Sequence, residues 1–248
     1  MQMTIEIIPF ERLIITFIPM VLVIFLMRSW GLNYVKACYS IIRMLLQLML
    51  IGYALIMIFE SESSLMTLSV LSLMILASSW ISLNTLTKAP QNPFQNKLRL
   101  FMIAITSVLL GGGVMLVIVT QWVLSLDPWF LPRYMIPLAG MIFATAMTSI
   151  SLAGERLQSE LVQGKPYEAA SKVAFNTSMI PNINAMFAVG LVSLPGMMTG
   201  QILSGVSPFI AARYQIMVMC MLFSAAGISA FVFLKLAKIQ FSVDLSNR

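Results

Sequence analysis

Long stretches without a charged residue alternate with short polar connections along almost the whole chain. The charge-free stretches cover residues 13–27 (extendable back to residue 7), 44–59, 63–87, 100–126, 134–154, 173–212 and 214–234. A helix needs about 20 mostly apolar residues to cross a bilayer, and six of these stretches can each hold one crossing. The pattern predicts an all-α, polytopic integral membrane protein.

The stretch 173–212 allows two interpretations. It can hold one membrane-spanning helix preceded by a polar surface segment, or two short helices broken at Pro195-Gly196. Asn176, Asn182 and Asn184 argue against lipid burial of its first third, because an unpaired amide is costly in hydrocarbon. The single helix brings the expected total to about seven.

The basic residues favour seven crossings, with the N-terminus outside and the C-terminus inside. Twelve of the 15 Lys and Arg residues then lie in cytoplasmic segments, and only Arg12, Arg133 and Arg213 lie outside. This is a strong positive-inside bias, and two helices in the stretch 173–212 would weaken it by sending Lys235 and Lys238 outward. The net charge of +6 is explained by this anchoring, so no nucleic-acid partner is needed.

Composition leaves no room for a separate soluble domain. The chain of 248 residues is 59% hydrophobic and 10% charged, whereas soluble domains carry about 25% charged residues. We therefore expect residues 1–248 to form a single transmembrane domain. The longest polar segment, about 154–184, is expected to be cytoplasmic, with a short amphipathic helix, a turn at Gly164-Lys165-Pro166 and a second helix on the membrane surface or against a partner. Its candidate coupling residues are Glu155, Arg156, Glu160, Gly164, Pro166 and Glu168.

Several classes of chemistry are excluded by missing residues. The chain contains no histidine, which removes HExxH metalloproteases and serine–histidine hydrolysis. No GxxxxGK[ST] sequence is present, so the chain cannot bind ATP by a P-loop. The triplet Gly111-Gly112-Gly113 lies inside an apolar stretch and is interpreted as a helix-packing or kink site. We expect no catalytic residues and no enzymatic activity in this chain.

Polar and small residues inside the apolar stretches are the usual material of a translocation pathway. The densest group lies at 193–201, where Pro195 removes a backbone hydrogen bond and predicts a kinked or unwound helix. Two interpretations remain open. Gly196, Gly200 and Ser204 recur every four residues, as in a helix-packing seam. Alternatively, the backbone freed near Pro195 lines a cavity; the candidate pathway residues of this group are Ser193, Pro195, Met197, Met198, Thr199 and Gln201.

Gln47 is a further pathway candidate, because it lies deep in the second stretch and needs a polar partner. Arg43, one helical turn earlier, is interpreted as a snorkelling anchor. The 21 methionines raise the possibility of a soft-metal site, but their dispersal favours flexible core filler. Met197 and Met198, beside the predicted break, are the exception. The sequence offers no recognisable metal-ligand set.

The run from Gly190 to Gly205, followed by Pro208, Ala212 and 214–216, resembles the signature of the FetB-type permeases. Arg43, Gln47-Leu48 and Gly52-Tyr53 match that family's second helix, and the stretch 137–141 (PLAGM) matches its fifth. These are membrane subunits of a bacterial ABC transporter family linked to iron export, with plant relatives linked to aluminium tolerance.

The resemblance implies a permease that exports iron, another metal ion or a metal-related solute across the bacterial inner membrane. A separate cytosolic ABC ATPase would dock on the segment 154–184 and bind ATP-Mg, while this chain binds no cofactor itself. The family architecture implies a permease homodimer surrounded by lipid. The alternative is a stand-alone channel or secondary carrier without an ATPase partner.

Overall fold

The computed structural model describes residues 8–60, 63–84, 86 and 96–246. The chain divides into two compact units, Met1–Ser61 with Leu203–Gly205 and Glu62–Ile202 with Val206–Arg248. Within the described ranges, six helices are long and apolar enough to cross a membrane. The chain is thus an all-α, multi-pass membrane protein, as predicted, while the count of seven crossings and their direction stay predictions.

The first unit is a helical hairpin. It contains α1 (Phe10–Ile15), α2 (Phe17–Ser29) and α3 (Tyr34–Glu60), and α2 and α3 contact each other. The part Glu11–Ser29 is apolar enough to form one crossing and α3 a second. None of the residues of α2 is buried, as suits a helix that faces lipid or another chain.

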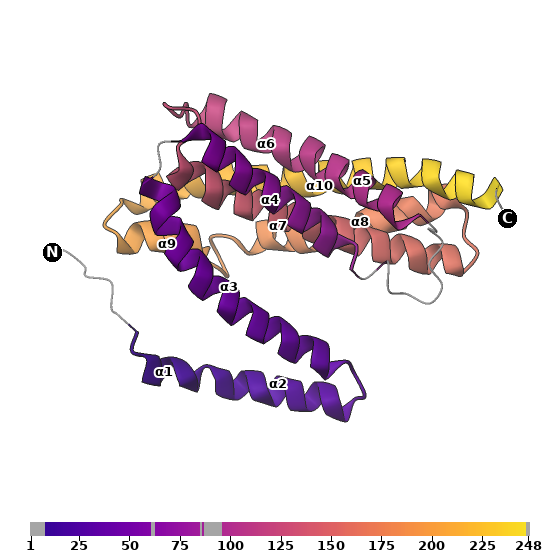
Figure 1. Ribbon diagram of the computed structural model, residues 1–248, viewed down its shortest axis with the longest axis horizontal. Coiled ribbons are helices and arrows are strands. Elements are labelled where there is room, and N and C mark those ends of the chain that lie inside the picture. Colours follow the sequence, from indigo (N-terminus) through magenta and orange to yellow (C-terminus); the bar gives the residue numbers. More distant parts are fainter. Residues whose placement is uncertain (1–7, 61–62, 85, 87–95, 247–248) are drawn as a thin grey trace. The chain divides into compact units, whose positions relative to one another are not determined.

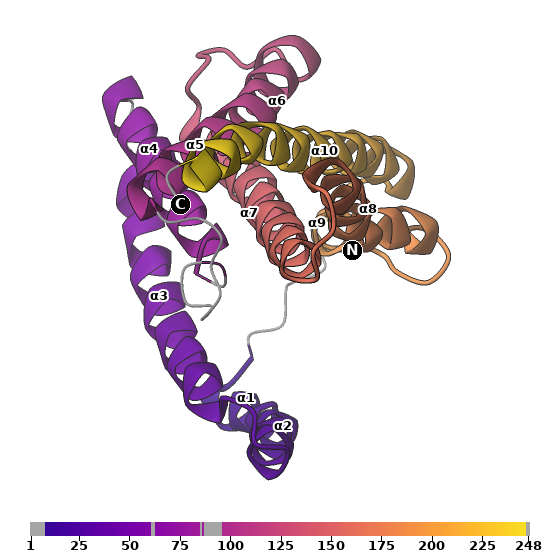
Figure 2. The ribbon, with the colours of Figure 1, turned by 90° about the vertical axis from the view of Figure 1, so that its right-hand side faces the viewer.

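The second unit is a helix bundle built around one long helix. Its elements are α4 (Ser64–Ser82), α5 (Lys97–Val108), η1 (Leu109–Gly113), α6 (Val114–Val117), η2 (Ile118–Val123), α7 (Pro132–Val162), α8 (Tyr167–Ala188), α9 (Gly196–Leu203) and α10 (Pro208–Ser246). α5 to η2 form one continuous apolar helix with two π-helical turns. α7 packs against α4, α8 and α10, which lie around it in Figures 1 and 2.

Small residues let these helices approach closely. Because lipid is as apolar as the side chains, association in a membrane depends on close packing and on hydrogen bonds between helices. The Ser149 hydroxyl of α7 donates to the Ala226 carbonyl of α10 at 3.1 Å. The fully buried small residues that line the helix contacts include Ala139, Ala146 and Ala153 of α7, Ala170, Ala174 and Ser178 of α8, and Ala226 and Ala230 of α10.

The glycine triplet 111–113 is a helix-packing site, one of the two roles predicted for it. It forms the end of the π-helical turn η1, and Gly111 and Gly112 are buried. A Cβ atom on Gly112 would lie 2.9 Å from Cδ1 of Phe143 on α7. Real Cβ contacts are essentially never this short, so any other residue at position 112 would require the Phe143 side chain to shift.

The arrangement predicted for residues 154–184 needs correction. The first part is no separate short helix, because α7 runs unbroken to Val162. The chain does turn at Gly164, whose φ of 82° suits glycine. Beyond the turn, α8 packs along α7 and α10 instead of lying apart on a surface. Its small residues at four-residue spacing bury one face, while Asn176 and Asn184 lie on the exposed side.

The stretch 173–212 differs from the predicted single crossing and is closer to the alternative, two helices with a break at Pro195-Gly196. The helix continues to Ala188, is interrupted over residues 189–195, and resumes as the eight-residue α9. The interruption next to Pro195 is therefore present, but the long helix of this stretch lies before it. The asparagines do not require a separate surface segment, because they need only avoid the buried face of α8.

Candidate functional site

Local hydrogen bonds hold the interruption between α8 and α9. The amides of Val192 and Ser193 both donate to the carbonyl of Ala188, at 2.8 and 3.1 Å. The Thr199 hydroxyl lies 3.2 Å from the carbonyl oxygens of both Leu194 and Pro195. Thr199 thus satisfies the backbone at the start of α9 and fixes where this helix begins.

A cavity of about 610 Å³ opens between α7, α9 and the start of α10. Met197 and Gln201, two of the predicted pathway residues, line it. Opposite them lie Pro137, Leu138 and Met141 of the PLAGM stretch on α7. The full lining consists of Leu124, Arg133, Tyr134, Pro137, Leu138, Met141, Met197, Gln201, Val206, Ile210, Tyr214 and Met217. Two sequence stretches sixty residues apart thus meet at one cavity.

The polar groups of this cavity are few. Among the described residues that line it, Arg133 alone is charged, and the phenols of Tyr134 and Tyr214 add hydroxyl groups. The side-chain oxygen of Gln201 is buried and has no hydrogen-bond partner among the described residues. A buried acceptor without a donor costs free energy, so the site favours a solute that offers a donor or a positive charge to this oxygen.

The donor set does not resemble a resident metal site. Among the described residues, no group of three or more His, Cys, Asp or Glu side chains comes together. The cavity instead combines the Gln201 amide, the Arg133 guanidinium and the thioethers of Met141, Met197 and Met217. This lining offers soft thioether sulfurs and few oxygen ligands.

The other predicted pathway residues lie outside the cavity lining. Ser193 is exposed in the loop before α9, and Pro195 and Met198 are half-buried. Gln47 is exposed on α3 in the first unit.

The predicted packing seam has open space beside its two glycines. A Cβ atom on Gly196 or Gly200 would meet no heavy atom within 4 Å, and Ser204 is exposed. The close approach expected from the spacing of these residues is therefore not made at the two glycines by the described chain. The helix-packing role of this seam stays a prediction.

The opposite end of the second unit carries a cluster of charges at the turn between α7 and α8 (Figure 1). Glu160 is fully buried and forms ion pairs with Arg156, at 2.5 Å, and with Lys165. Both basic side chains are about half exposed, at 44% and 45%. The Lys165 pair joins the last turn of α7 to the loop, and the Arg156 pair lies within α7. Glu160 thus helps to hold the turn in place while its two partners face outward.

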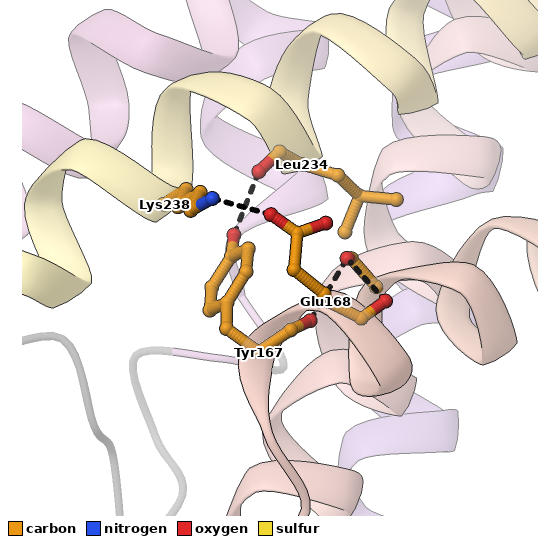
Figure 3. A network of polar contacts seen from close by, with 5 residues as sticks. Tyr167, Glu168, Leu234 and Lys238 are labelled. Atoms are coloured by element: carbon orange, nitrogen blue, oxygen red, sulfur yellow. Dashed lines mark hydrogen bonds and ion pairs between the residues drawn. The ribbon is translucent and has the colours of Figure 1, made fainter.

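The start of α8 is tied to α10 beside this turn (Figure 3). The Tyr167 hydroxyl donates to the Leu234 carbonyl at 2.6 Å, and Glu168 forms an ion pair with Lys238. Burial raises the pKa of the Tyr167 phenol, which stays protonated as a donor. The hydrogen bond from Lys238 lowers the pKa of the Glu168 carboxyl. Of the predicted coupling residues, Glu155, Arg156, Gly164, Pro166 and Glu168 are exposed and Glu160 is not.

Residue patterns alone missed part of the cavity. The charge pattern predicts only that Arg133 lies outside the membrane, and the resemblance includes Tyr214 without giving it a role. Tyr134 and Met217 carry no signal beyond lying near helix ends. The PLAGM stretch was noted for its resemblance, without a role. Its proline and methionine face the cavity, which gives the stretch a place in the site.

Comparison with known proteins gives a consistent set of relatives. The sequence profile of the uncharacterised protein family UPF0014 matches residues 10–241. The UPF0014 membrane protein slr1647 of Synechocystis is 35% identical over 71% of each chain. The probable iron export permease protein FetB of Escherichia coli is 32% identical over 78% of this chain and 76% of its own length. The protein ALUMINUM SENSITIVE 3 of Arabidopsis thaliana is 31% identical over 77% and 72%. No solved structure matches.

Proposed function

Because the chain belongs to the UPF0014 family of membrane proteins, we propose that it is the membrane-spanning permease subunit of an ABC transporter. Its cargo is iron, another metal ion or a metal-related solute, exported across the bacterial inner membrane. The name of the Escherichia coli relative, a probable iron export permease, supports this choice of cargo and direction.

The observation that carries the proposal is the cavity between α7, α9 and α10. It joins the PLAGM stretch to Met197 and Gln201, beside an interrupted helix. Interrupted helices inside membrane proteins are tolerated where they line a cavity, and such cavities are typical of substrate sites. The unpartnered Gln201 oxygen and the Arg133 guanidinium give the cavity one acceptor and one positive charge for a passing complex.

α7 connects this cavity to the charged turn at the other end of the bundle. Arg133 and Glu160 are 27 residues apart on one unbroken helix, which corresponds to about 40 Å. That length exceeds the hydrocarbon core of about 30 Å, so the two sites belong to opposite faces of the membrane. A movement of the turn would be transmitted to the cavity, because α7 is a rigid element that connects the two.

The energy source in this proposal is a separate ATPase. It binds ATP-Mg and docks at the turn between α7 and α8, where Glu155, Arg156, Lys165 and Glu168 present charges to the solvent. Two permease chains pair in the membrane. Gln47 on α3 stays a predicted pathway residue. Alternating access then follows from tilting of α7 and α8 against the rest of the bundle.

Reconstitution tests the proposal directly. Proteoliposomes containing the chain and the ATP-binding protein that co-purifies with it should transport iron or another metal only when ATP is supplied on the docking side. Glu155→Arg at the turn should uncouple ATP hydrolysis from transport, whereas Glu60→Arg at the end of α3 should not. Metal flux through the chain alone, without ATP or a partner, would instead identify a stand-alone channel or carrier.

A further inference from the structure

A groove lies between the start of α8 and the last membrane turns of α10, next to the contacts of Figure 3. It has a volume of about 320 Å³ and is lined by Tyr167, Glu168, Ser171, Lys172, Phe175, Phe231, Leu234, Lys235 and Lys238. Its floor is aromatic, because Phe175 and Phe231 meet edge to face with ring centroids 6.4 Å apart. Its rim is basic.

The charge of this rim is unbalanced. Glu168 is the acidic residue of the lining, and it is paired with Lys238. Lys172 and Lys235 form no ion pair with a described side chain, and Lys235 lies 5.5 Å from the centroid of the Phe231 ring. The groove therefore presents two positive charges over an apolar floor and is suited to an anionic ligand.

The groove continues along the same two helices towards the middle of the membrane. A second cavity, of about 380 Å³, begins at Phe175 and is lined by Asn176, Met179, Ile183, Phe223, Ser224, Gly227 and Ile228. From Lys235 to Phe223 the helix α10 covers 12 residues, about 18 Å. Half of a hydrocarbon core is about 15 Å, so the two cavities together extend through one leaflet.

The position of the lysines places the basic rim at the membrane surface. Residues 214–234 of α10 carry no charge, and Lys235 is the first charged residue after them. A charged head beside Lys172 and Lys235 would thus lie at the interface, and its hydrocarbon tail would follow the trough past Phe175. A soluble anion or an acidic peptide would leave the trough empty.

We propose that this groove between α8 and α10 is a binding site for an anionic phospholipid, whose phosphate pairs with Lys172 and Lys235 and whose acyl chain lies on Phe175, Met179 and Phe223. The site does not depend on the cargo of the cavity at the other end of the unit. A bound lipid would hold α8 against α10 beside the turn, and would stabilise the bundle in anionic membranes.

Native mass spectrometry of the full chain tests the site, after exchange into mixed micelles with equal amounts of phosphatidylglycerol and phosphatidylcholine. The wild type should retain phosphatidylglycerol selectively. Lys172→Gln with Lys235→Gln should weaken retention about 25-fold, since each lysine near an anionic head contributes about fivefold. Lys36→Gln with Lys97→Gln, the same charge change at exposed lysines elsewhere, should retain lipid like the wild type.

A second variant separates a lipid from other anions. Ser224→Trp fills the trough and leaves every lysine in place, so it should also lose the lipid, whereas Ile216→Trp on an exposed part of α10 should not. Equal retention by the double lysine variant and its control would overturn the proposal. Unchanged retention in Ser224→Trp would also overturn it. So would a labelling experiment in which a partner protein, and not phosphatidylglycerol, protects Lys172 and Lys235.

Discussion

Ser229 of α10 lies directly against Gly111 of the π-helical turn η1. A Cβ atom added to Gly111 would fall 2.1 Å from the Ser229 hydroxyl oxygen, 2.6 Å from its backbone nitrogen and 2.9 Å from its Cα atom. The backbones of the two helices therefore touch at this point. Rotation of the serine side chain cannot relieve a clash with backbone atoms, so the contact requires glycine.

Replacement of Gly111 by alanine should consequently destabilise the bundle by about 1–3 kcal/mol, the usual cost of overpacking a tight core. Gly113→Ala, two residues along the same turn, is the matched control, because its Cβ atom would meet only Cδ2 of Leu109 at 3.8 Å. Thermal unfolding in detergent, followed by tryptophan fluorescence, measures both. Equal melting temperatures for the two variants would show that η1 and α10 do not touch at Gly111.

Gln201→Leu should change stability and transport in opposite directions. Removing a buried acceptor that has no donor should raise the stability by about 1 kcal/mol, and the apolar side chain fits the cavity wall. If Gln201 contacts the cargo, loss of that hydrogen bond should lower the transport rate about tenfold. The two readouts are the melting temperature of the purified chain and ATP-driven flux in proteoliposomes.

The control for this variant is Gln215→Leu. The side-chain oxygen of Gln215 is also buried and without a partner among the described residues, but Gln215 does not line the cavity. Its substitution should raise the melting temperature similarly and leave the flux unchanged. Equal loss of flux in both variants would show that Gln201 is not a pathway residue and that both glutamines have a general role.

The helices of this fold follow closely from the apolar stretches, because each stretch must satisfy its backbone hydrogen bonds internally. The turn at Gly164 and the interruption beside Pro195 were also predictable, since Gly and Pro restrict backbone conformation in known ways. The packing of α8 within the bundle was not predictable in this way. Its asparagines suggested an exposed surface segment, while the packing of Ala170, Ala174 and Ser178 depends on which helices face them.

Only the part of the candidate site that lies on α9 was predicted from the sequence. Met197 and Gln201 stood out because polar and soft side chains beside a proline are unusual in an apolar stretch. Arg133, Tyr134 and Met217 join them only because α7 and α10 begin at the same end of the bundle. That juxtaposition depends on tertiary packing, which the spacing of residues along one helix does not contain.

The ion pair between Glu168 and Lys238 should make stability depend on acidity. Lys238 lowers the pKa of the Glu168 carboxyl below its ordinary value of 4.5, so the folded state favours the ionised form. This contribution is complete above the ordinary value and is lost as the pH falls through the lowered pKa of the folded state. Both side chains are largely exposed, so the effect should be small. Melting temperatures of wild type and Glu168→Gln should differ at pH 7 and converge once the pH falls below the lowered pKa of Glu168; a constant difference would contradict the pair.

The charge cluster at the turn should respond asymmetrically to substitution, because Glu160 is buried and its partners are half exposed. Glu160→Gln leaves Arg156 and Lys165 free to turn to the solvent, so the melting temperature should fall only modestly. Arg156→Gln with Lys165→Gln leaves a buried carboxylate without a counter-charge, which is the costlier outcome, and the melting temperature should fall further. The triple variant should recover part of that loss, because no charge then remains buried. If the double variant were as stable as Glu160→Gln, Glu160 would have to be accessible to water, and the turn between α7 and α8 would be looser than the geometry of its ion pairs indicates.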